Sequence, residues 1–292
     1  MEMRPILGGC IEKLWNKDIE MEELTLRELQ QVSLEILADV HEFCKKNGLH
    51  YSIDYGTLIG ALRHKGFIPW DDDVDIVMPR PDFEEFCKTY QSDDYRMIYY
   101  GNDSSALAAF ARVVDCKKTH YETIRPWTKQ ESGVWIDIFP IDGVEEDSRQ
   151  YERRYSRLRR MGKVAYKFRR QNHHKENSDS AWSKLMTGIA PILGMGGKLP
   201  AWIINKMVKI MSRIPYGSTP YVGQCSCLDD GPIQFPIEDF KNYVLLPFEQ
   251  YEFYAISGYD HHLRQLYGDY MQLPPENQRK PKQSWIHFYK KI

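Results

Sequence analysis

The stretch from residue 51 to residue 79 constrains the fold of this chain more than any other. A Gly56-Thr57 turn lies between an apolar, strand-like run and a short helix-like run. Four acidic residues then lead into a predicted strand at 74–78: Asp71, Asp72, Asp73 and Asp75. Because side chains alternate between the two faces of a strand, the first, third and fourth of these should share one face, and the second should point away. The pattern concentrates negative charge on one side of the strand.

Carboxylates held this close repel one another unless a cation or basic side chains compensate them. Ligation by oxygen alone favours magnesium, manganese or calcium. The spacing of the acids matches the start of a calcium-binding EF-hand loop. That loop needs glycine and glutamate further on, where this sequence has Ile76 and Asp82, so an EF-hand is excluded. A solvated acidic turn or a helix cap is the other alternative, and the apolar residues around the acids argue against it.

A second apolar run, at 133–142, is interrupted by Asp137. Burying a carboxylate in a strand is unfavourable unless a cation or hydrogen bonds satisfy it. We therefore predict that Asp73, Asp75 and Asp137 are the catalytic residues and the metal ligands. Asp142 follows a proline and is predicted to lie in a turn, where it either caps a helix or supports the site indirectly.

The motifs resemble those of nucleotidyltransferase-fold proteins, in which a Gly-Ser/Thr turn precedes a paired-acid strand and a third acidic strand. They are more similar still to the LicD and fukutin-type phosphotransferases, through GTLIGALRHKGFIPWDDDVDIVM from residue 56, WIDIFPIDG at 135–143 and LRQLYGDYMQLPP at 263–275. The gap between the turn and the paired acids is longer than in the generic pattern. The resemblance implies an α/β (α+β) fold: a mixed sheet flanked by helices, with a helical and short-strand C-terminal extension.

No repeat, low-complexity linker or clear break divides the 292 residues, and 42% of them are hydrophobic. We expect one domain, with a core at 20–145 and an extension at 146–292. The apolar spacing predicts helices at 20–47, 82–90, 200–212 and 260–267, and strands at 49–55, 95–100, 108–115, 133–142, 243–247 and 251–256.

Carboxylates around Mg²⁺, with Mn²⁺ as the alternative, suit phosphoryl transfer because the metal neutralises phosphate charge. Gly56 allows the backbone to approach a phosphate closely, and the Thr57 hydroxyl can donate to it. Further candidates for substrate binding are Arg63, His64, Lys65, Asp71 and Arg112. Arg63 is preferred for its bidentate geometry. For Arg112, an ordinary ion pair is an equally open interpretation.

The resemblance implies a particular reaction. A CDP-linked donor such as CDP-choline is split, its phospho-alcohol passes to a hydroxyl of a cell-surface glycan or glycolipid precursor, and CMP leaves. The residues by themselves indicate only metal-dependent transfer from a nucleotide. A generic nucleotidyltransferase that moves the nucleoside monophosphate is a second hypothesis, and it would use the same acids. A non-catalytic glycan-binding scaffold is a third, although it would not need them.

A choline group calls for an aromatic surface, and Trp70, Trp127 and Trp135 are unspecific candidates for it. A net charge of −2 and the absence of a recognised motif argue against nucleic acid. The basic run at 151–175 is read first as a solvated helix face. A phosphate-bearing acceptor or anionic lipid headgroups are the second interpretation.

The uncharged segment at 185–197 is shorter than the roughly twenty residues that span a bilayer. No secretory signal is recognised near the N-terminus. The six cysteines are scattered and are predicted to be reduced, and the Cys225/Cys227 pair is weak evidence for a metal. We therefore expect a cytoplasmic protein, with peripheral contact at the inner membrane face as an open alternative.

Overall fold

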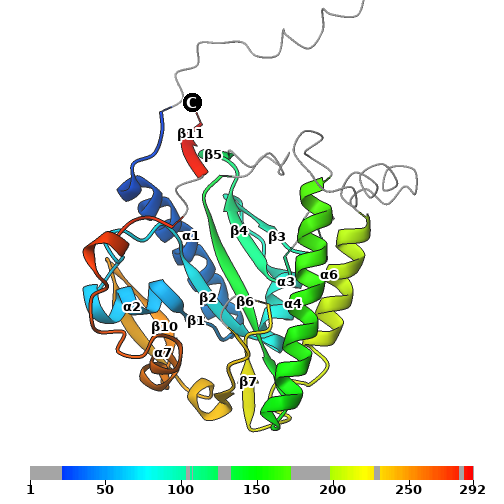
Figure 1. The fold of residues 1–292 in the computed structure, drawn as a ribbon. Helices are drawn as coiled ribbons and strands as arrows, with labels where there is room; N and C mark the ends of the chain where they lie inside the picture. Colours follow the sequence, from blue (N-terminus) through cyan, green and yellow to red (C-terminus); the bar gives the residue numbers. More distant parts are fainter. Residues whose placement is uncertain are drawn as a thin grey trace, which may run out of the picture.

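A mixed β-sheet organises the computed structural model, which describes residues 22–102, 106, 108–123, 133–171, 198–226, 231–282 and 286–291. The sheet contains, in spatial order, β1 (Ser52–Ile53), β2 (Asp75–Pro79), β6 (Trp135–Gly143), β4 (Ala111–Asp115) and β3 (Tyr95–Ile98) (Figure 1). The β2–β6 pair is parallel, and the other neighbours in this order are antiparallel. The far end of β6 pairs with β7 (Tyr221–Gly223), which pairs with β8 (Phe235–Pro236). The predicted mixed α/β fold is confirmed.

The central strands are buried on both faces. Ile76 and Ile138 belong to the main hydrophobic core, and their neighbours Val77 and Phe139 belong to a second cluster. This alternation explains why β2 and β6 read as nearly continuous apolar runs, as parallel strands covered on both sides do. Polar residues within these runs therefore stand out as functional candidates.

The helix α1 (Leu26–Asn47) packs against the sheet through residues such as Ile36. Thr25 and Glu28 form a capping box at its start, and Gly48 ends it with a φ of 66° in the left-handed region that glycine tolerates. The helix α3 (Arg80–Thr89) buries Phe83 and Phe86 in the same core. The predicted helix at 82–90 is confirmed to within two residues, and the one at 20–47 ends as predicted but begins only at Leu26.

The helix α2 (Tyr55–His64) begins immediately after the short strand β1. The sequence predicted a strand through residue 55 with the Gly-Thr turn after it. Instead, Gly56 and Thr57 lie in the first turn of α2, because Asp54 already caps the helix by accepting from the Tyr55 N–H at 2.7 Å.

The C-terminal part of the chain returns to the sheet in several places. The helices α4 (Ser148–Gln171) and α6 (Lys198–Met211) pack side by side around a third hydrophobic cluster (Figure 1). The hairpin of β9 (Tyr243–Phe248) and β10 (Tyr251–Ile256) and the helix α7 (Tyr259–Tyr267) confirm predicted elements. The remaining bounds are β5 (Thr119–Thr123), η2 (Ile237–Phe240), η3 (Glu276–Gln278) and β11 (Ile286–Lys290), which pairs with β5.

Among the described residues, no helix is both long enough and apolar enough to cross a bilayer. The described cysteines Cys44, Cys87, Cys116 and Cys225 are free thiols, as predicted. Several sequence predictions lie outside the described residues: the segment 185–197, the end of the basic run, the N-terminal segment, and the side chains of Cys10, Trp127 and Cys227.

Candidate active site

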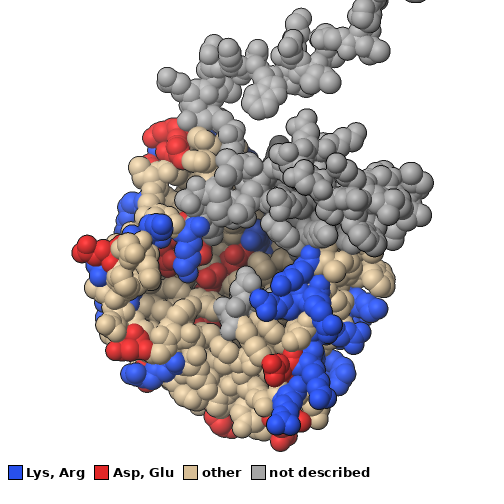
Figure 2. All heavy atoms as spheres, in the orientation of Figure 1, with Lys and Arg blue, Asp and Glu red and all other residues tan. Residues whose placement is uncertain are grey.

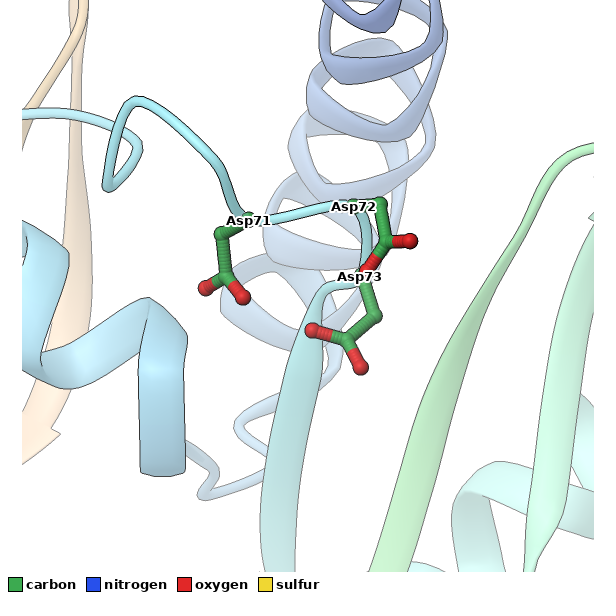
Figure 3. Close-up of side chains that lie close together, drawn as sticks. All are labelled: Asp71, Asp72 and Asp73. Carbon is green, nitrogen blue, oxygen red and sulfur yellow. The ribbon is translucent and has the colours of Figure 1, made fainter. Parts of the chain in front are cut away.

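Four carboxylates come together at the start of β2 and on the neighbouring strand β6. Asp75 is the first residue of β2 and stands opposite Asp137 in the parallel register. Asp71 and Asp73 lie in the preceding loop, and Figure 3 shows their carboxylates directed into a common space. Asp and Glu atoms are visible in the recessed middle of the face shown in Figure 2. The structure therefore gathers the three predicted metal ligands and Asp71 in one place.

Asp72 does not lie as predicted. It was expected to point away, yet one of its oxygens lies within 4.8 Å of an oxygen from Asp71 and one from Asp73. Its Oδ1 also accepts from the backbone N–H of Lys282 at 3.3 Å. The physical reason is that β2 begins only at Asp75, so strand alternation does not apply to the loop before it.

Burial and mutual repulsion raise the proton affinity of the acids. Burial first, then the charge of Asp73, raises the pKa of Asp71 to about 8. Burial also raises the pKa of Asp73, and it raises the pKa of Asp75 well above its usual range. Lys282 opposes all three shifts without cancelling them. Buried carboxylates that repel one another favour their protonated forms unless a cation joins them.

Asp137 has a basic partner on the adjacent strand. Arg112 stands opposite it in the β4–β6 pairing, and its Nε donates to Asp137 Oδ1 at 2.7 Å. The guanidinium also lies over the Trp135 ring, 4.6 Å from the centroid. The structure shows an ion pair that directs Arg112 toward the acids, and the expected contact of Arg112 with substrate stays a prediction. The ion pair fixes the orientation of the Asp137 carboxylate.

Gly56 and Thr57, in the first turn of α2, lie next to two of the acidic residues. A Cβ at Gly56 would overlap the carboxylate of Asp71, so only glycine leaves that carboxylate its space. The buried Thr57 accepts at Oγ1 from the backbone N–H of Asp75 at 3.0 Å. Both residues therefore hold the acids in place, and their expected contact with phosphate stays a prediction.

A pocket of about 410 Å³ opens beside Asp71. Segment 267–282, which includes the end of the third sequence motif, forms one wall of it. Arg63 also lines the pocket and donates through Nη1 to the carbonyls of Tyr270 at 3.0 Å and Gln272 at 3.3 Å. Other lining residues include Gly56, Trp70, Tyr267, Asp269, Lys280 and Lys282.

Two of the predicted substrate-binding residues do not line this pocket. His64 packs edge-to-face against Trp70, with ring centroids 6.5 Å apart. Lys65 is exposed and ends α2 with a φ of 59°. Neither is among the described residues that line the pocket. Of the basic run at 63–65, only Arg63 is brought to the candidate site.

Sequence reasoning missed Lys282. Its ammonium group lies close enough to lower the pKa of Asp71, Asp73 and Asp75. The only signal was a Lys-Pro-Lys run shortly after the third motif, which reads as an ordinary solvated segment. The proximity of Lys282 to the acids depends on the path of the distant C-terminal segment.

Asp142 was predicted to lie in a turn, and this was wrong. It is a fully buried residue of β6, and its carboxylate accepts from Arg80 Nε at 2.6 Å and Nη2 at 2.7 Å. The strand continues past Pro140, which pairs with Met78. Because Asp137 and Asp142 are an odd number of residues apart, they face opposite sides of β6. Asp142 therefore joins β6 to the start of α3 and lies away from the acidic cluster.

A mixed sheet whose parallel central pair presents facing acids defines a nucleotidyltransferase-type domain. Residues 48–179 match the family model described as "LicD/FKTN/FKRP, nucleotidyltransferase domain". The chain is 33% identical over 276 residues to "Lipopolysaccharide cholinephosphotransferase LicD" of Haemophilus influenzae, covering 89% of this chain and 97% of that protein. The chain belongs to the LicD family, which confirms the resemblance found in the sequence.

Two uncharacterised proteins match shorter portions of the chain. One, from Rickettsia typhi, is 36% identical over 84 residues, which are 27% of each chain. The other, from Rickettsia prowazekii, is 52% identical over 42 residues, covering 14% of this chain and 16% of that protein.

Proposed function

We propose that the protein transfers a phospho-alcohol from a CDP-linked donor to a hydroxyl of a glycan or glycolipid, with phosphocholine as the first candidate. The acceptor oxygen bonds to the phosphorus that carries the alcohol, the bond from that phosphorus to the CMP oxygen breaks, and the hydroxyl proton passes to a base. The observation that carries the proposal is the cluster of buried, mutually repelling acids beside a pocket with basic side chains. The near full-length similarity to a cholinephosphotransferase supports the choice of phosphocholine.

The acidic cluster fits a divalent cation. Its donors are carboxylate oxygens, which magnesium and manganese prefer, and burial together with the neighbouring acids disfavours their charged forms until a cation joins them. Asp73, Asp75 and Asp137 would hold the ion, with Asp71 and Asp72 beside them. A bound ion would neutralise the diphosphate of the donor and favour departure of CMP. The contacts from Arg112 and Thr57 keep two of these acids oriented before substrate arrives.

The pocket beside Asp71 is the proposed donor site. Its volume of about 410 Å³ lies in the range of small-molecule sites. Lys280 and Lys282 on the 267–282 wall, together with Arg63, would contact the diphosphate because all three line this pocket. The aromatic residues Trp70 and Tyr267 also line this pocket and would contact the alcohol head group of the donor. Trp135 is less suited to this role, since Arg112 lies over its ring.

The proposed acceptor is lipid-linked and is reached from the cytoplasmic side by a peripherally associated protein. The name of the Haemophilus relative, which acts on lipopolysaccharide, supports a glycolipid acceptor.

Two labelled forms of CDP-choline would test the function with a glycolipid fraction as acceptor. Label in the choline should appear in the glycolipid while CMP is released, and the Asp75→Asn variant should show neither. Label from the cytosine ring in the glycolipid would instead indicate nucleotidyl transfer. If a panel of CDP-alcohols with Mg²⁺ gave no CMP, the enzymatic proposal would be contradicted.

A further inference from the structure

The helix α4 presents an exposed basic face that the catalytic proposal does not use. Ten of its residues are Lys or Arg and one is acidic. Its core-facing side is made by Tyr151, Tyr155 and Leu158, which are buried against α6. On the opposite side are five exposed residues, which we call the α4 basic face: Arg153, Arg157, Arg159, Arg160 and Lys163.

These side chains differ from those of an ordinary solvated helix. Surface helices usually place an acid three or four residues from each base, which gives weak ion pairs. Here Arg153 and Arg157 are spaced i, i+4, as are Arg159 and Lys163, and like charges at this spacing repel. Within the part of the chain that the structure describes, no carboxylate lies within 4 Å of the cationic atoms of the α4 basic face.

Arg154, on the same helix, shows what a structural arginine looks like in this protein. Its Nε pairs with Glu145 at 3.0 Å, and its Nη atoms donate to the carbonyls of Gly143, Ile210 and Met211. It is buried and fully engaged. The residues of the α4 basic face have no comparable role in holding the fold together, so their charges are available to a partner.

The basic face lies on the same side of the molecule as the acidic cluster. Figure 2 shows Lys and Arg gathered over α4, beside the recess in which Asp and Glu atoms are visible. A flat anionic surface that meets this side would contact α4 while the recess opens toward it. A helix rigidly packed through its opposite stripe suits such a contact, because docking requires no refolding of α4.

We infer that the α4 basic face docks the protein onto an anionic phospholipid bilayer. Each Lys or Arg near such a surface gains electrostatic energy, and the repulsion between neighbouring arginines is relieved at the same time. The inference rests on the proposed function in one respect: that function explains why the α4 basic face lies beside the acidic recess, since docking would bring a lipid-linked acceptor to the recess. The docking itself is independent of catalysis.

The experiment is sedimentation of the full chain, without donor, with vesicles containing phosphatidylglycerol or with vesicles of phosphatidylcholine alone. The wild-type protein should sediment only with the anionic vesicles and should be released as salt is raised. The variant Arg153→Glu/Arg157→Glu/Arg160→Glu should lose at least about a hundredfold in apparent affinity. The milder triple Gln variant should lose less, which separates charge from misfolding.

The matched control changes the same number of charges elsewhere. Lys45, Lys46 and Lys88 are exposed on α1 and α3, and the variant Lys45→Glu/Lys46→Glu/Lys88→Glu should bind vesicles nearly as well as the wild type. Equal losses in both triple variants would show a mere effect of net charge and overturn the inference. So would tighter binding of the wild-type protein to a random-sequence DNA duplex than to the anionic vesicles at equal ionic strength.

A failure of this inference can be told apart from a failure of the proposed function. If docking is correct, the α4 Glu variant releases CMP at the wild-type rate with a water-soluble acceptor. With a vesicle-borne acceptor it releases CMP more slowly than the wild type. Vesicle binding by the wild type without any CMP release would leave docking supported while contradicting the proposed enzyme.

Discussion

Asp75 and Asp137 stand opposite each other in the parallel pairing of β2 with β6, so two acids from distant parts of the sequence open onto the same side of the sheet. On the far side of β6, Arg112 stands opposite Asp137 and donates to it. Asp75 on β2, Asp137 on β6 and Arg112 on β4 thus lie side by side across three adjacent strands. The proposed metal site depends on this register.

Replacing Asp75 or Asp137 with Asn should reduce turnover about a thousandfold, because it removes a negative charge where a metal would be held and keeps the side-chain shape. CMP release at saturating Mg²⁺ measures the loss, and thermal melting checks the fold. Asp72→Asn is the control: its Oδ1 receives a backbone N–H, which an amide oxygen also accepts. A larger loss at Asp72 than at Asp137 would contradict the assignment.

Asp142→Asn should lower stability and leave the chemistry intact. The change leaves the buried Arg80 guanidinium without a charged partner, and breaking such a pair typically costs about 3–5 kcal/mol. Denaturant unfolding measures the effect, and kcat per folded molecule should be close to wild type. The double variant Arg80→Met/Asp142→Leu should recover much of the stability. A lost kcat with unchanged stability would instead place Asp142 in the active site.

Gly56→Ala should reduce turnover about tenfold, because its Cβ would displace the Asp71 carboxylate beside the pocket. Gly48→Ala is the matched control. It has open space around its Cβ and a positive φ, so it should lose about 1 kcal/mol of stability without a change in kcat. In a double-mutant cycle with Asp71→Ala, the Gly56 change should add little further loss. Full additivity would show that Gly56 acts in another way.

The parts of the fold that the sequence predicted well depend on local signals. The end of α1 follows from Gly48, which acts within one helical turn, whereas its start was predicted at residue 20, before the capping box of Thr25 and Glu28. The Asp73, Asp75 and Asp137 cluster follows from acids placed in apolar runs, where burial would otherwise be unfavourable. These signals are present in short stretches of sequence and need no knowledge of strand register.

The features that were missed depend on contacts between distant segments. The Arg80–Asp142 pair requires β6 to continue past Pro140, and a proline usually favours the end of a strand. Asp72 was misplaced because the alternation rule was applied to a loop. The approach of Lys282 to the acids depends on the return of the C-terminal segment, which local patterns do not specify.

Lys282→Ala should raise the KM for the CDP-linked donor about tenfold with a smaller change in kcat, because one charge-assisted contact to phosphate is removed. Lys282→Arg should restore most of the affinity. Lys45→Ala, an exposed lysine on α1, serves as the control. Steady-state kinetics at varied donor concentration measure the changes in KM and kcat separately. An unchanged KM in Lys282→Ala would exclude this lysine from donor binding.

Magnesium should stabilise the folded protein, because a cation would relieve the repulsion between the buried carboxylates. An ion that binds only the folded state adds about 2.7 kcal/mol at a hundred times its Kd, which corresponds to a Tm increase of about 5 °C or more. The Asp73→Asn/Asp75→Asn variant should lose most of this increase. In EDTA the same variant should melt at or above the wild-type temperature, because carboxylate repulsion has been removed.

Calorimetry with Mg²⁺, Mn²⁺ and EDTA measures these shifts without any substrate. The variant Glu84→Gln/Glu85→Gln, which removes two exposed acids on α3, should respond to Mg²⁺ as the wild type does. If the Asp73→Asn/Asp75→Asn variant gained as much from Mg²⁺ as the wild type, the cation would be binding elsewhere. The assignment of Asp73 and Asp75 as its ligands would then be wrong, whatever their effect on turnover.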